Sequence, residues 1–336
     1  MKNIFNIKTE TDFRQKCLEI FRYQYENVEV YRKFCDYLRV NSNEIQEIKD
    51  IPFLPIEMFK NHLVLDQNFS TDQYFQSSGT TQMNRSKHFI ADFGLYEESI
   101  YQSFAKFIGK PEDFIFLGLL PNYSENPHSS LIYMVDFLMK KSGKPENGYF
   151  LYNHQELLEL LQNLKDKKVI LFGVSFALLD FLDSFSETLD FPDLFIIETG
   201  GMKGRKEEMT KDELLKILQK GFGTNRIFSE YSMTELLSQA YSLGENIYET
   251  PNWMRILIRN TEDPFSYVEN GRTGAINIID LANIHSCSFI ATQDLGKIME
   301  DFSAFSASEN EISSPKFQVL GRIDHSDIRG CSLLVS

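Results

Sequence analysis

Between residues 114 and 231 the chain repeats one unit, in which a short apolar stretch is followed by an amphipathic stretch with helical spacing. Strands that are apolar throughout are typical of a sheet covered on both faces. Amphipathic stretches of 10 to 15 residues between them connect neighbouring parallel strands. The repeat therefore predicts an α/β fold with a mainly parallel sheet flanked by helices. The predicted strands read FIFLGLLP, GYFLYN, KVILFGVS, LFIIETGG and RIFSEYS, and the predicted helices read SSLIYMVDFLMKKSG, HQELLELLQNLKDKK, FALLDFLDSF and TKDELLKILQKGFG.

Capping residues predict where several helices begin and end. In the N-terminal stretch TDFRQKCLEIF, Thr11 or Asp12 is placed to cap the start of a helix. A glycine after the last periodic residue ends a helix, because it adopts the left-handed conformation without a steric cost. We therefore expect one helix to end at Gly143 and another to run from Thr210 to Gly221.

The pattern changes after about residue 250, where GAINIIDL, CSFIATQDLG and FQVLGRID predict short strands and turns. We therefore expect an α/β core over residues 1–250, which includes the N-terminal helices. A β-rich subdomain and a C-terminal tail are expected over residues 251–336.

The charge and the cysteines exclude several classes of protein. The 34 basic and 48 acidic residues give a net charge of −14, which repels nucleic acid and anionic membrane surfaces. No apolar run approaches the roughly 18 residues of a membrane span, and the N-terminus lacks an apolar signal core. The cysteines have neither C-x-x-C nor zinc-site spacing; they are Cys17, Cys35, Cys287 and Cys331. We expect a cytoplasmic protein with no nucleic-acid partner and no membrane span.

A hydroxyl-rich loop, SSGTT, lies within the stretch YFQSSGTTQMNRSKHF and is followed by Arg85, Lys87 and His88. The residues allow two interpretations. A solvated hairpin turn explains the glycine and the small polar side chains. A concave set of hydroxyl and backbone donors with a cation nearby is also what a polyphosphate needs. The loop is not a Walker A sequence, because G-x-x-x-x-G-K-[ST] is absent.

Other polar turns are expected at the carboxyl ends of strands, where open α/β sheets bind their ligands. In SEYSMTEL, Thr234 and Glu235 offer a hydroxyl and a carboxylate at a surface-accessible turn. Mg²⁺ bound to phosphate prefers such oxygen ligands, although an acidic residue at a helix start also acts as a cap. In TQDLG, Asp294 either forms an Asx turn or accepts hydrogen bonds from a ribose diol.

These motifs, in this order, resemble those of the ANL superfamily of adenylate-forming enzymes. SSGTT is similar to its phosphate loop, YSMTE to its Y-G-x-T-E signature, TQDLG to its T-G-D turn and GRIDHSDI to its G-R-x-D hinge. The motifs span residues 74–328, about three-quarters of the chain. The stretches FRYQYENVEVYRKFC, PFLPIEMFK and SEYSMTELLSQAYS resemble the LuxE-type fatty acyl-protein synthetases, and phenylacetate-CoA ligase-like enzymes share the general motifs. The resemblance implies an ANL-type N-terminal domain with mainly parallel sheets.

The resemblance also implies a role for each motif in binding ATP and Mg²⁺. It assigns the ATP phosphates to the hydroxyl loop and to the threonine of YSMTE, and Mg²⁺ to the glutamate of YSMTE. The implied residues are Ser77, Ser78, Gly79, Thr80, Thr81 and Thr234 for the phosphates, Gly200, Gly201 and Tyr231 for adenine, Asp294 and Arg322 for the ribose, and Glu235 for Mg²⁺.

The chain departs from the superfamily at three glycines and at its end. Gln82, Ser232 and Gln293 stand where the family has glycine, and a side chain at a position that needs positive φ costs on the order of 1 kcal/mol. We therefore expect altered loop shapes. Larger members continue into a C-terminal ANL domain with an adenylation lysine, and this domain is missing here. Lys87, Lys203 or another in-domain cation is expected to take that role. LuxE-type proteins also lack most of the domain.

The resemblance implies that the chain activates a carboxylic acid, in LuxE-type proteins a fatty acid, as an acyl-adenylate. The acyl group then passes to a cysteine near the C-terminus, a position that Cys331 matches. Cys331 also fits a small buried hydrophobe beside Leu333 and Leu334, whereas Arg329 would favour its thiolate. Cys17 and Cys35 are expected in the core, and Cys287 in a strand.

Two other functions fit the same residues. The first is an acyl- or aryl-CoA ligase, or a ligase that uses a carrier protein as acceptor. The second, of a different class, is a catalytically weak subunit that binds an acyl reductase or thioesterase partner. Carboxylate-dependent exchange between ATP and pyrophosphate separates the enzymes from the binding subunit.

Overall fold

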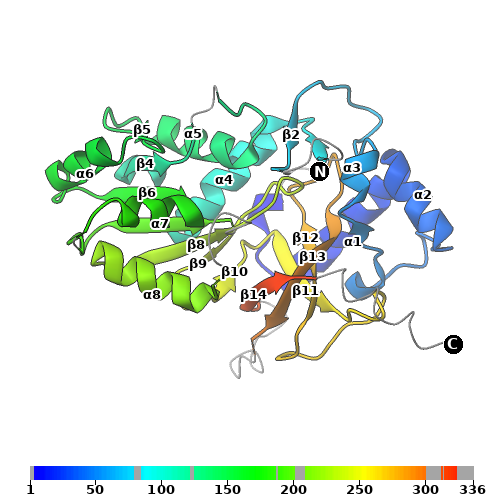
Figure 1. Cartoon of the computed structure of the whole chain (residues 1–336). Helices are drawn as coiled ribbons and strands as arrows, with labels where there is room; N and C mark the ends of the chain where they lie inside the picture. Colours follow the sequence, from blue (N-terminus) through cyan, green and yellow to red (C-terminus); the bar gives the residue numbers. More distant parts are fainter. Residues whose placement is uncertain are drawn as a thin grey trace, which may run out of the picture.

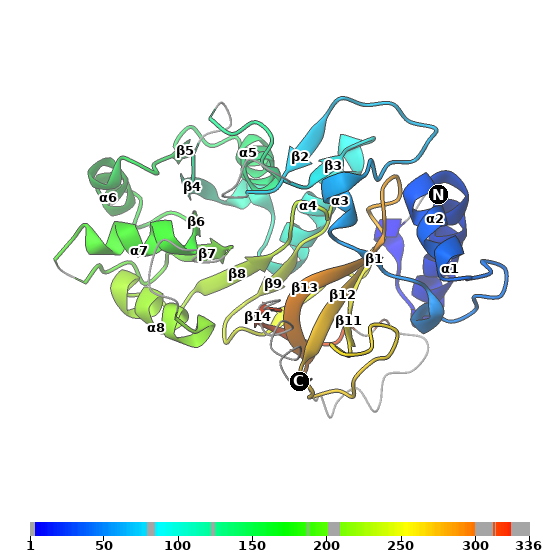
Figure 2. The same ribbon diagram turned by 45° about the vertical axis from the view of Figure 1, so that its right-hand side comes forward.

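Twelve strands in the described part of the chain form one sheet (Figures 1 and 2). The computed structural model describes residues 4–78, 85–121, 125–186, 188–200, 209–299, 312 and 314–323. The strand order is β11-β12-β13-β14-β10-β9-β8-β7-β6-β4-β5, and β1 pairs with β13. The sheet therefore has a half formed by β4 to β8 and a half formed mostly by β11 to β14.

The first half confirms the predicted parallel α/β sheet. Each pair of neighbours among its five strands is parallel. These strands are β5 (Gly148–Tyr149), β4 (Ile115–Leu119), β6 (Val169–Val174), β7 (Phe195–Thr199) and β8 (Ile227–Tyr231). β9 (Ala240–Ser242) then adds to β8 in the antiparallel direction.

Helices cover both faces of this half, which explains why its strands carry few polar residues. On one face, Phe116 and Ile197 pack in the same core cluster as Phe104 and Leu138 of α4 (Phe93–Phe107) and α5 (Ser130–Ser142). On the other face, Leu117, Leu171 and Ile196 form a second cluster with the apolar side chains of three helices. These are α6 (His154–Asn163), α7 (Ser175–Asp183) and α8 (Lys211–Phe222).

The second half is antiparallel apart from the short strand β1, in agreement with the β-rich pattern predicted after residue 250. Its strands are β10 (Tyr248–Glu249), β11 (Met254–Arg259), β12 (Gly274–Asp280), β13 (Phe289–Ile298), β14 (Phe317–Arg322) and β1 (Leu54–Pro55). Hydrogen bonding passes from one half to the other through β10, which pairs with both β9 and β14. The division into domains at residue 250 stays a prediction.

The N-terminal helices α1 (Glu10–Asn27) and α2 (Glu29–Tyr37) pack against the antiparallel half (Figure 2). Tyr31 of α2 stacks on Phe289 of β13, with ring centroids 6.2 Å apart. Between these helices and the parallel half lie α3 (Met58–Asn61) and a hairpin of β2 (Tyr74–Gln76) and β3 (Lys87–Phe89). Short 3₁₀ helices cover residues Ile4–Asn6, Ile48–Asp50 and Pro111–Asp113.

Helix ends agree with the sequence in one case and differ in two. Gly143 ends α5 in the left-handed conformation, as predicted. The cap of α1 is Thr9, which forms a capping box with Asp12, so Thr11 and Asp12 are not the cap. The end of α8 at Gly221 is also wrong, because the helix continues to Phe222 and the left-handed residue is Gly223. A Cβ on Gly221 would lie 2.3 Å from a methyl of Leu182, so this glycine allows α8 to approach α7 closely.

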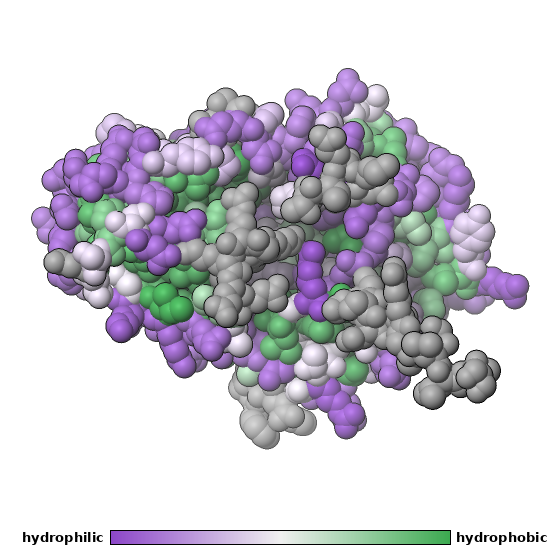
Figure 3. Space-filling view, in the orientation of Figure 1, coloured by the Kyte–Doolittle hydropathy of each residue, from purple (hydrophilic) through white to green (hydrophobic). Residues whose placement is uncertain are grey.

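The outer surface agrees with the strongly negative composition. Hydrophilic side chains cover much of the face drawn in Figure 3, and apolar side chains occur in small groups between them. Within the described residues, no helix combines the length and the apolar character needed to cross a membrane.

Candidate active site

The β2–β3 hairpin positions the start and the exit of the hydroxyl loop. Ser77 and Ser86 lie opposite each other, because the Ser77 amide donates to the Ser86 carbonyl and the Ser86 amide to the Ser77 hydroxyl, both at 3.1 Å. Ser78 is exposed. The remaining predicted phosphate-loop residues, Gly79, Thr80 and Thr81, lie outside the described residues. The described ends of the loop place it above the YSMTE segment.

Side chains alternate along β3, so that neighbouring residues face opposite sides. Ser86 and His88 are buried and face Thr234 and Glu235. Lys87 lies between them and faces the other side, where its Nζ is 4.7 Å from the centre of the Tyr74 ring. The alternation therefore separates Lys87 from the YSMTE segment.

His128 is a residue of this region that sequence reasoning missed. Its ring stacks on Tyr74 with centroids 4.4 Å apart, and its backbone carbonyl accepts a hydrogen bond from the Gln76 amide. The signal for it was present, because PNYSENPHSS is a polar loop directly after the predicted strand FIFLGLLP. His128 extends the candidate site along the outer side of the hairpin.

Glu235 lies in a buried environment, whereas the sequence predicted a surface-accessible turn. It is 5% exposed, and its carboxylate accepts a hydrogen bond from the Ser86 hydroxyl. Burial raises the pKa of the Glu235 carboxyl; the Ser86 hydrogen bond and the positive charges of Arg322 and Lys60 oppose that rise. The prediction failed because β3, which covers the turn, is 149 positions away in the sequence.

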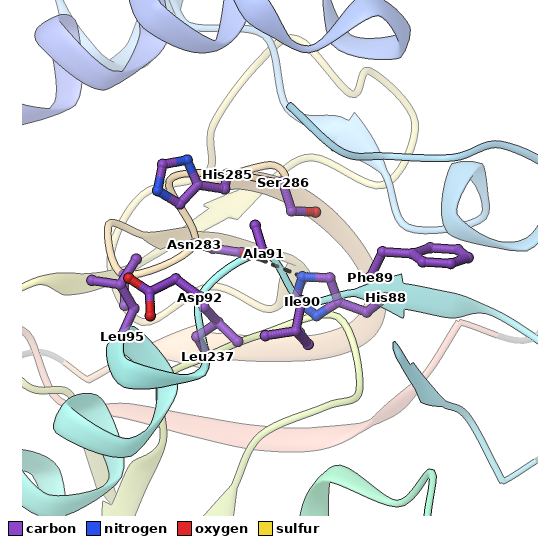
Figure 4. Close-up of a pocket in the computed structure, with 11 residues that line it drawn as sticks. His88, Phe89, Ile90, Ala91, Asp92, Leu95, Leu237, Asn283, His285 and Ser286 are labelled. Carbon is purple, nitrogen blue, oxygen red and sulfur yellow. Dashed lines mark hydrogen bonds between the residues drawn. The ribbon is translucent and has the colours of Figure 1, made fainter. Parts of the chain in front are cut away.

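His88 and Asn283 hold the backbone of the same segment (Figure 4). His88 Nδ1 donates to the Thr234 carbonyl at 2.9 Å, and Nε2 lies 3.1 Å from the Asn283 side-chain oxygen. The Asn283 amide donates to the carbonyls of Glu235 and Cys287 at 2.8 and 2.9 Å. Burial lowers the pKa of His88 to about 4, so the ring is neutral near pH 7. Both side chains therefore fix the turn that carries Thr234 and Glu235.

The pocket drawn in Figure 4 is too small for a substrate. It lies beside His88 and is lined on other sides by Leu95, Leu237 and His285. Its volume of about 10 Å³ is enough for a single water molecule. This space is therefore part of the packing behind the turn.

Asp280 anchors the segment that follows Glu235. Its carboxylate is fully buried and accepts from the amides of Leu237 and Ser238 at 2.7 and 2.9 Å, and from the Ser238 hydroxyl at 2.5 Å. The Ala282 amide adds a fourth bond at 3.1 Å. Burial raises the pKa of Asp280, and these four donors oppose the rise. Asp280 thus joins β12 to the chain that leaves the YSMTE motif.

Replacing Asp280 with alanine is expected to lower the free energy of unfolding by about 3 kcal/mol, because buried donors lose their acceptor. Urea denaturation followed by circular dichroism measures this loss. The control is Asp263→Ala in an exposed loop, where Asp263 accepts from the Phe265 amide and the expected loss is at most about 0.5 kcal/mol. Equal stability of the two variants would contradict the anchoring role.

Asp294 brings together two other predicted site residues. The Tyr231 hydroxyl donates to one of its carboxylate oxygens at 2.9 Å, and Arg322 Nε donates to the other at 3.2 Å. Asp294 lies inside the long strand β13, opposite Arg322 of β14, so the predicted turn at TQDLG is wrong. The pairing of β13 shifts register between Leu295 and Gly296, and this irregularity replaces the expected turn.

The carboxyl ends of β6 and β7 carry a charged cluster that the sequence did not indicate. Glu198 is fully buried and accepts hydrogen bonds from Lys211 of α8 and from Ser175 of α7. The Ser175 hydroxyl also lies 3.2 Å from the carbonyl of Gly200, whose φ of 75° is left-handed. Gly201, the other predicted adenine residue, lies outside the described residues. The cluster therefore fixes the start of the predicted adenine loop.

The cysteines of the described residues are poor nucleophiles. Cys17, Cys35 and Cys287 are free and fully buried, as predicted for the first two. Burial raises the thiol pKa of all three, that of Cys35 to about 12, which suppresses the reactive thiolate. Cys287 precedes β13 and is not part of a strand, contrary to the prediction. Cys331 lies outside the described residues.

The donor set at the turn fits magnesium held jointly with phosphate. No group of three or more His, Cys, Asp or Glu residues suited to a metal occurs within the described part of the chain. Glu235 supplies one carboxylate, and its bond to Ser86 leaves lone pairs for a cation. Mg²⁺ commonly binds through one or two carboxylates, with substrate phosphates and water completing its shell.

Comparison with known protein families and sequences gives a consistent result. The family model described as "Acyl-protein synthetase, LuxE" matches residues 6–90 and 133–336. A long-chain-fatty-acid–luciferin-component ligase from Vibrio harveyi is 23% identical over an alignment that covers 94% of this chain and 85% of that protein. A protein of the same name from Photorhabdus luminescens is 39% identical over 64 residues, which are 19% of this chain and 54% of that sequence.

Solved structures share the fold at low sequence identity. An open conformation of 2-hydroxyisobutyryl-CoA ligase, in complex with 2-HIB-AMP and CoA, matches with a TM-score of 0.68 and 11% identity. The match covers 95% of this chain and 72% of that one. ATP-bound MatB from Rhodopseudomonas palustris matches with a TM-score of 0.53 and 15% identity, over 74% of this chain and 47% of that one. The architecture is therefore that of acyl-CoA ligases.

Proposed function

Because the chain belongs to the LuxE family of acyl-protein synthetases, we propose that it is an AMP-forming acid–thiol ligase. It activates a carboxylic acid with ATP as an acyl-adenylate and passes the acyl group to a thiol. The observation that carries the proposal is the buried contact between Ser86, at the exit of the hydroxyl loop, and Glu235. This contact joins a phosphate loop to a carboxylate suited to Mg²⁺, as phosphoryl chemistry requires.

The residues have separate tasks in the reaction. The hydroxyl loop, which begins at Ser77, holds the phosphates, while Thr234 lies beside it on a turn that His88 fixes. Asp294, held by Tyr231, accepts hydrogen bonds from the ribose. Mg²⁺, when bound at Glu235, neutralises phosphate charge. Catalysis then rests on positioning the acid for in-line attack on the α-phosphorus.

We take the acid to be a fatty acid and the acceptor to be a protein thiol. The named relatives are ligases of long-chain fatty acids, which supports this substrate class. The apolar side chains of α5 and α7 pack in the two core clusters, so they support the fold rather than define an acyl site. A carrier protein, or an acyl reductase or thioesterase, is the expected partner that receives the acyl group.

Carboxylate-dependent exchange of labelled pyrophosphate into ATP tests the proposal directly. The purified chain with Mg²⁺ is expected to catalyse exchange with saturated fatty acids and none without an acid. Acids of different chain length would then define the preferred substrate. Absence of exchange with every acid would overturn the proposal and favour a binding subunit.

Replacing Asp294 with alanine is expected to raise the KM for ATP about 10-fold, with kcat within about threefold of the wild type. Contacts to the ribose act equally on the ground state and the transition state, which explains this split. Initial rates of exchange at varied ATP measure it. Glu249→Ala, which removes a carboxylate paired with Lys316 on the surface, is the control with unchanged kinetics. A loss of kcat alone would contradict the ribose role.

A further inference from the structure

Forming an acyl-adenylate builds up negative charge around the α-phosphorus, and a cation at that point lowers the barrier. Among the predicted site residues, Lys87 does not face this region. It lies on β3 between Ser86 and His88, which both face the turn of Thr234 and Glu235. Its ammonium group instead lies over the Tyr74 ring, on the opposite side of the strand.

Arg322 is nearer to the turn but already has a partner. Its Nε donates to the Asp294 carboxylate at 3.2 Å, and the two residues are opposite each other in the pairing of β13 and β14. Its charge therefore stabilises the carboxylate assigned to the ribose. A separate cation is needed for the reacting phosphate.

Lys60 of α3 meets this requirement. The short helix is fixed beside β3, since the Ile56 amide donates to the Ala291 carbonyl at 3.0 Å and buried Phe59 packs edge-on against His88 (Figure 2). The Lys60 side chain is exposed, and no carboxylate of the described residues forms an ion pair with it. Its positive charge acts on the Glu235 carboxylate.

The contacts of α3 place Lys60 at the turn through a short chain of neighbours. Phe59 touches His88, His88 bonds the carbonyl of Thr234, and Glu235 follows in the sequence. An exposed lysine next to a buried anchor can move its flexible side chain toward a bound nucleotide. The sequence signal was PFLPIEMFK, which matched the LuxE-type pattern without an assigned role.

We propose that Lys60 is the in-domain catalytic cation that contacts the α-phosphate during adenylation, a role that rests on the proposed function. In the reaction, a carboxylate oxygen of the acid forms a bond to the α-phosphorus of ATP. The bond from that phosphorus to the bridging oxygen of the β-phosphate breaks, and pyrophosphate leaves with the electron pair. Lys60 stays protonated throughout and stabilises the charge by hydrogen bonding.

The test compares Lys60→Ala with Lys60→Arg, and uses Lys49→Ala, an exposed lysine on a 3₁₀ helix, as the matched control. Lys60→Ala is expected to lower the kcat of pyrophosphate exchange about 100-fold, with the KM for ATP changed less than about threefold. Lys60→Arg keeps the charge and is expected to retain most of the activity. Lys49→Ala is expected to match the wild type. Thermal melting of each variant checks the fold.

Two further measurements keep the outcome specific. Synthetic acyl-adenylate supplied to Lys60→Ala is expected to react with the thiol acceptor at the wild-type rate, because the phosphate step has been bypassed. Wild-type kcat in Lys60→Ala, or a change in the KM for ATP alone, would overturn the role of Lys60. A loss of kcat on Lys87→Ala with none on Lys60→Ala would return the role to Lys87. A wild-type chain without exchange would instead overturn the proposed function.

Discussion

Glu235→Gln is expected to lower Mg²⁺-dependent pyrophosphate exchange about 100-fold, which corresponds to about 2.7 kcal/mol of activation free energy. The amide oxygen can still accept the hydrogen bond from the Ser86 hydroxyl, so the buried contact and the fold are retained. The variant removes only the negative charge that a magnesium ion requires. The effect is therefore expected to appear as weaker Mg²⁺ dependence rather than as loss of stability.

Titration of exchange activity with Mg²⁺ measures this effect, and Glu249→Gln on the surface strand β10 is the matched control. Thermal melting is expected to be similar for both variants. Equal activity of Glu235→Gln and the wild type at limiting Mg²⁺ would contradict the metal assignment. A variant that fails to fold would instead show that the carboxylate has a structural role, so the melting curve separates the two cases.

The pH dependence of the wild type should carry the same signature. Burial raises the pKa of the Glu235 carboxyl, so the group keeps its proton to a higher pH than an ordinary glutamate does. Mg²⁺ binds the ionised form. Activity is therefore expected to rise with pH through the raised pKa of Glu235, and to fall again as the pH drops below it. Glu235→Gln, which does not titrate, is expected to lack this limb of the profile.

Much of the fold could be predicted from the sequence because the deciding signals are local. Apolar strands such as LFIIETGG and amphipathic helices such as TKDELLKILQKGFG each carry their own period over a few residues. Both were found in the predicted order. The end of α8 was missed because Gly221 is a packing glycine, and only the neighbouring helix residue Leu182 shows why it is there.

The candidate site was predictable as a set of motifs but not as an environment. The order of SSGTT, YSMTE and TQDLG indicated which residues to consider, yet burial depends on residues far apart in the sequence. Glu235 is covered by Ser86, and Asp280 supports it from β12. Lys60 lacked a functional signal of its own, because its position depends on how Phe59 packs against His88. Such long-range packing has no period that a sequence reveals.

Cys331→Ser is expected to abolish acylation of the chain while leaving pyrophosphate exchange intact. LuxE-type proteins carry the acyl group on a cysteine near the C-terminus, and Cys331 is the cysteine of this chain that matches. In the proposed step its thiolate attacks the acyl carbon of the adenylate, the bond from that carbon to the phosphate oxygen breaks, and AMP leaves. Serine, with a far higher pKa, does not supply this nucleophile at neutral pH.

Incubation with ATP, Mg²⁺ and a radiolabelled fatty acid measures the acylation. The wild type is expected to give a hydroxylamine-labile label on the peptide that contains Cys331, and Cys331→Ser none. Cys35→Ala is the control expected to keep the label, because Cys35 is buried and its thiol pKa is raised to about 12. The described cysteines are thus unsuited to accept the acyl group, so a label on any of them would require local unfolding. A label that persists in Cys331→Ser, or that forms only on added CoA, would assign the acceptor elsewhere and favour a CoA ligase.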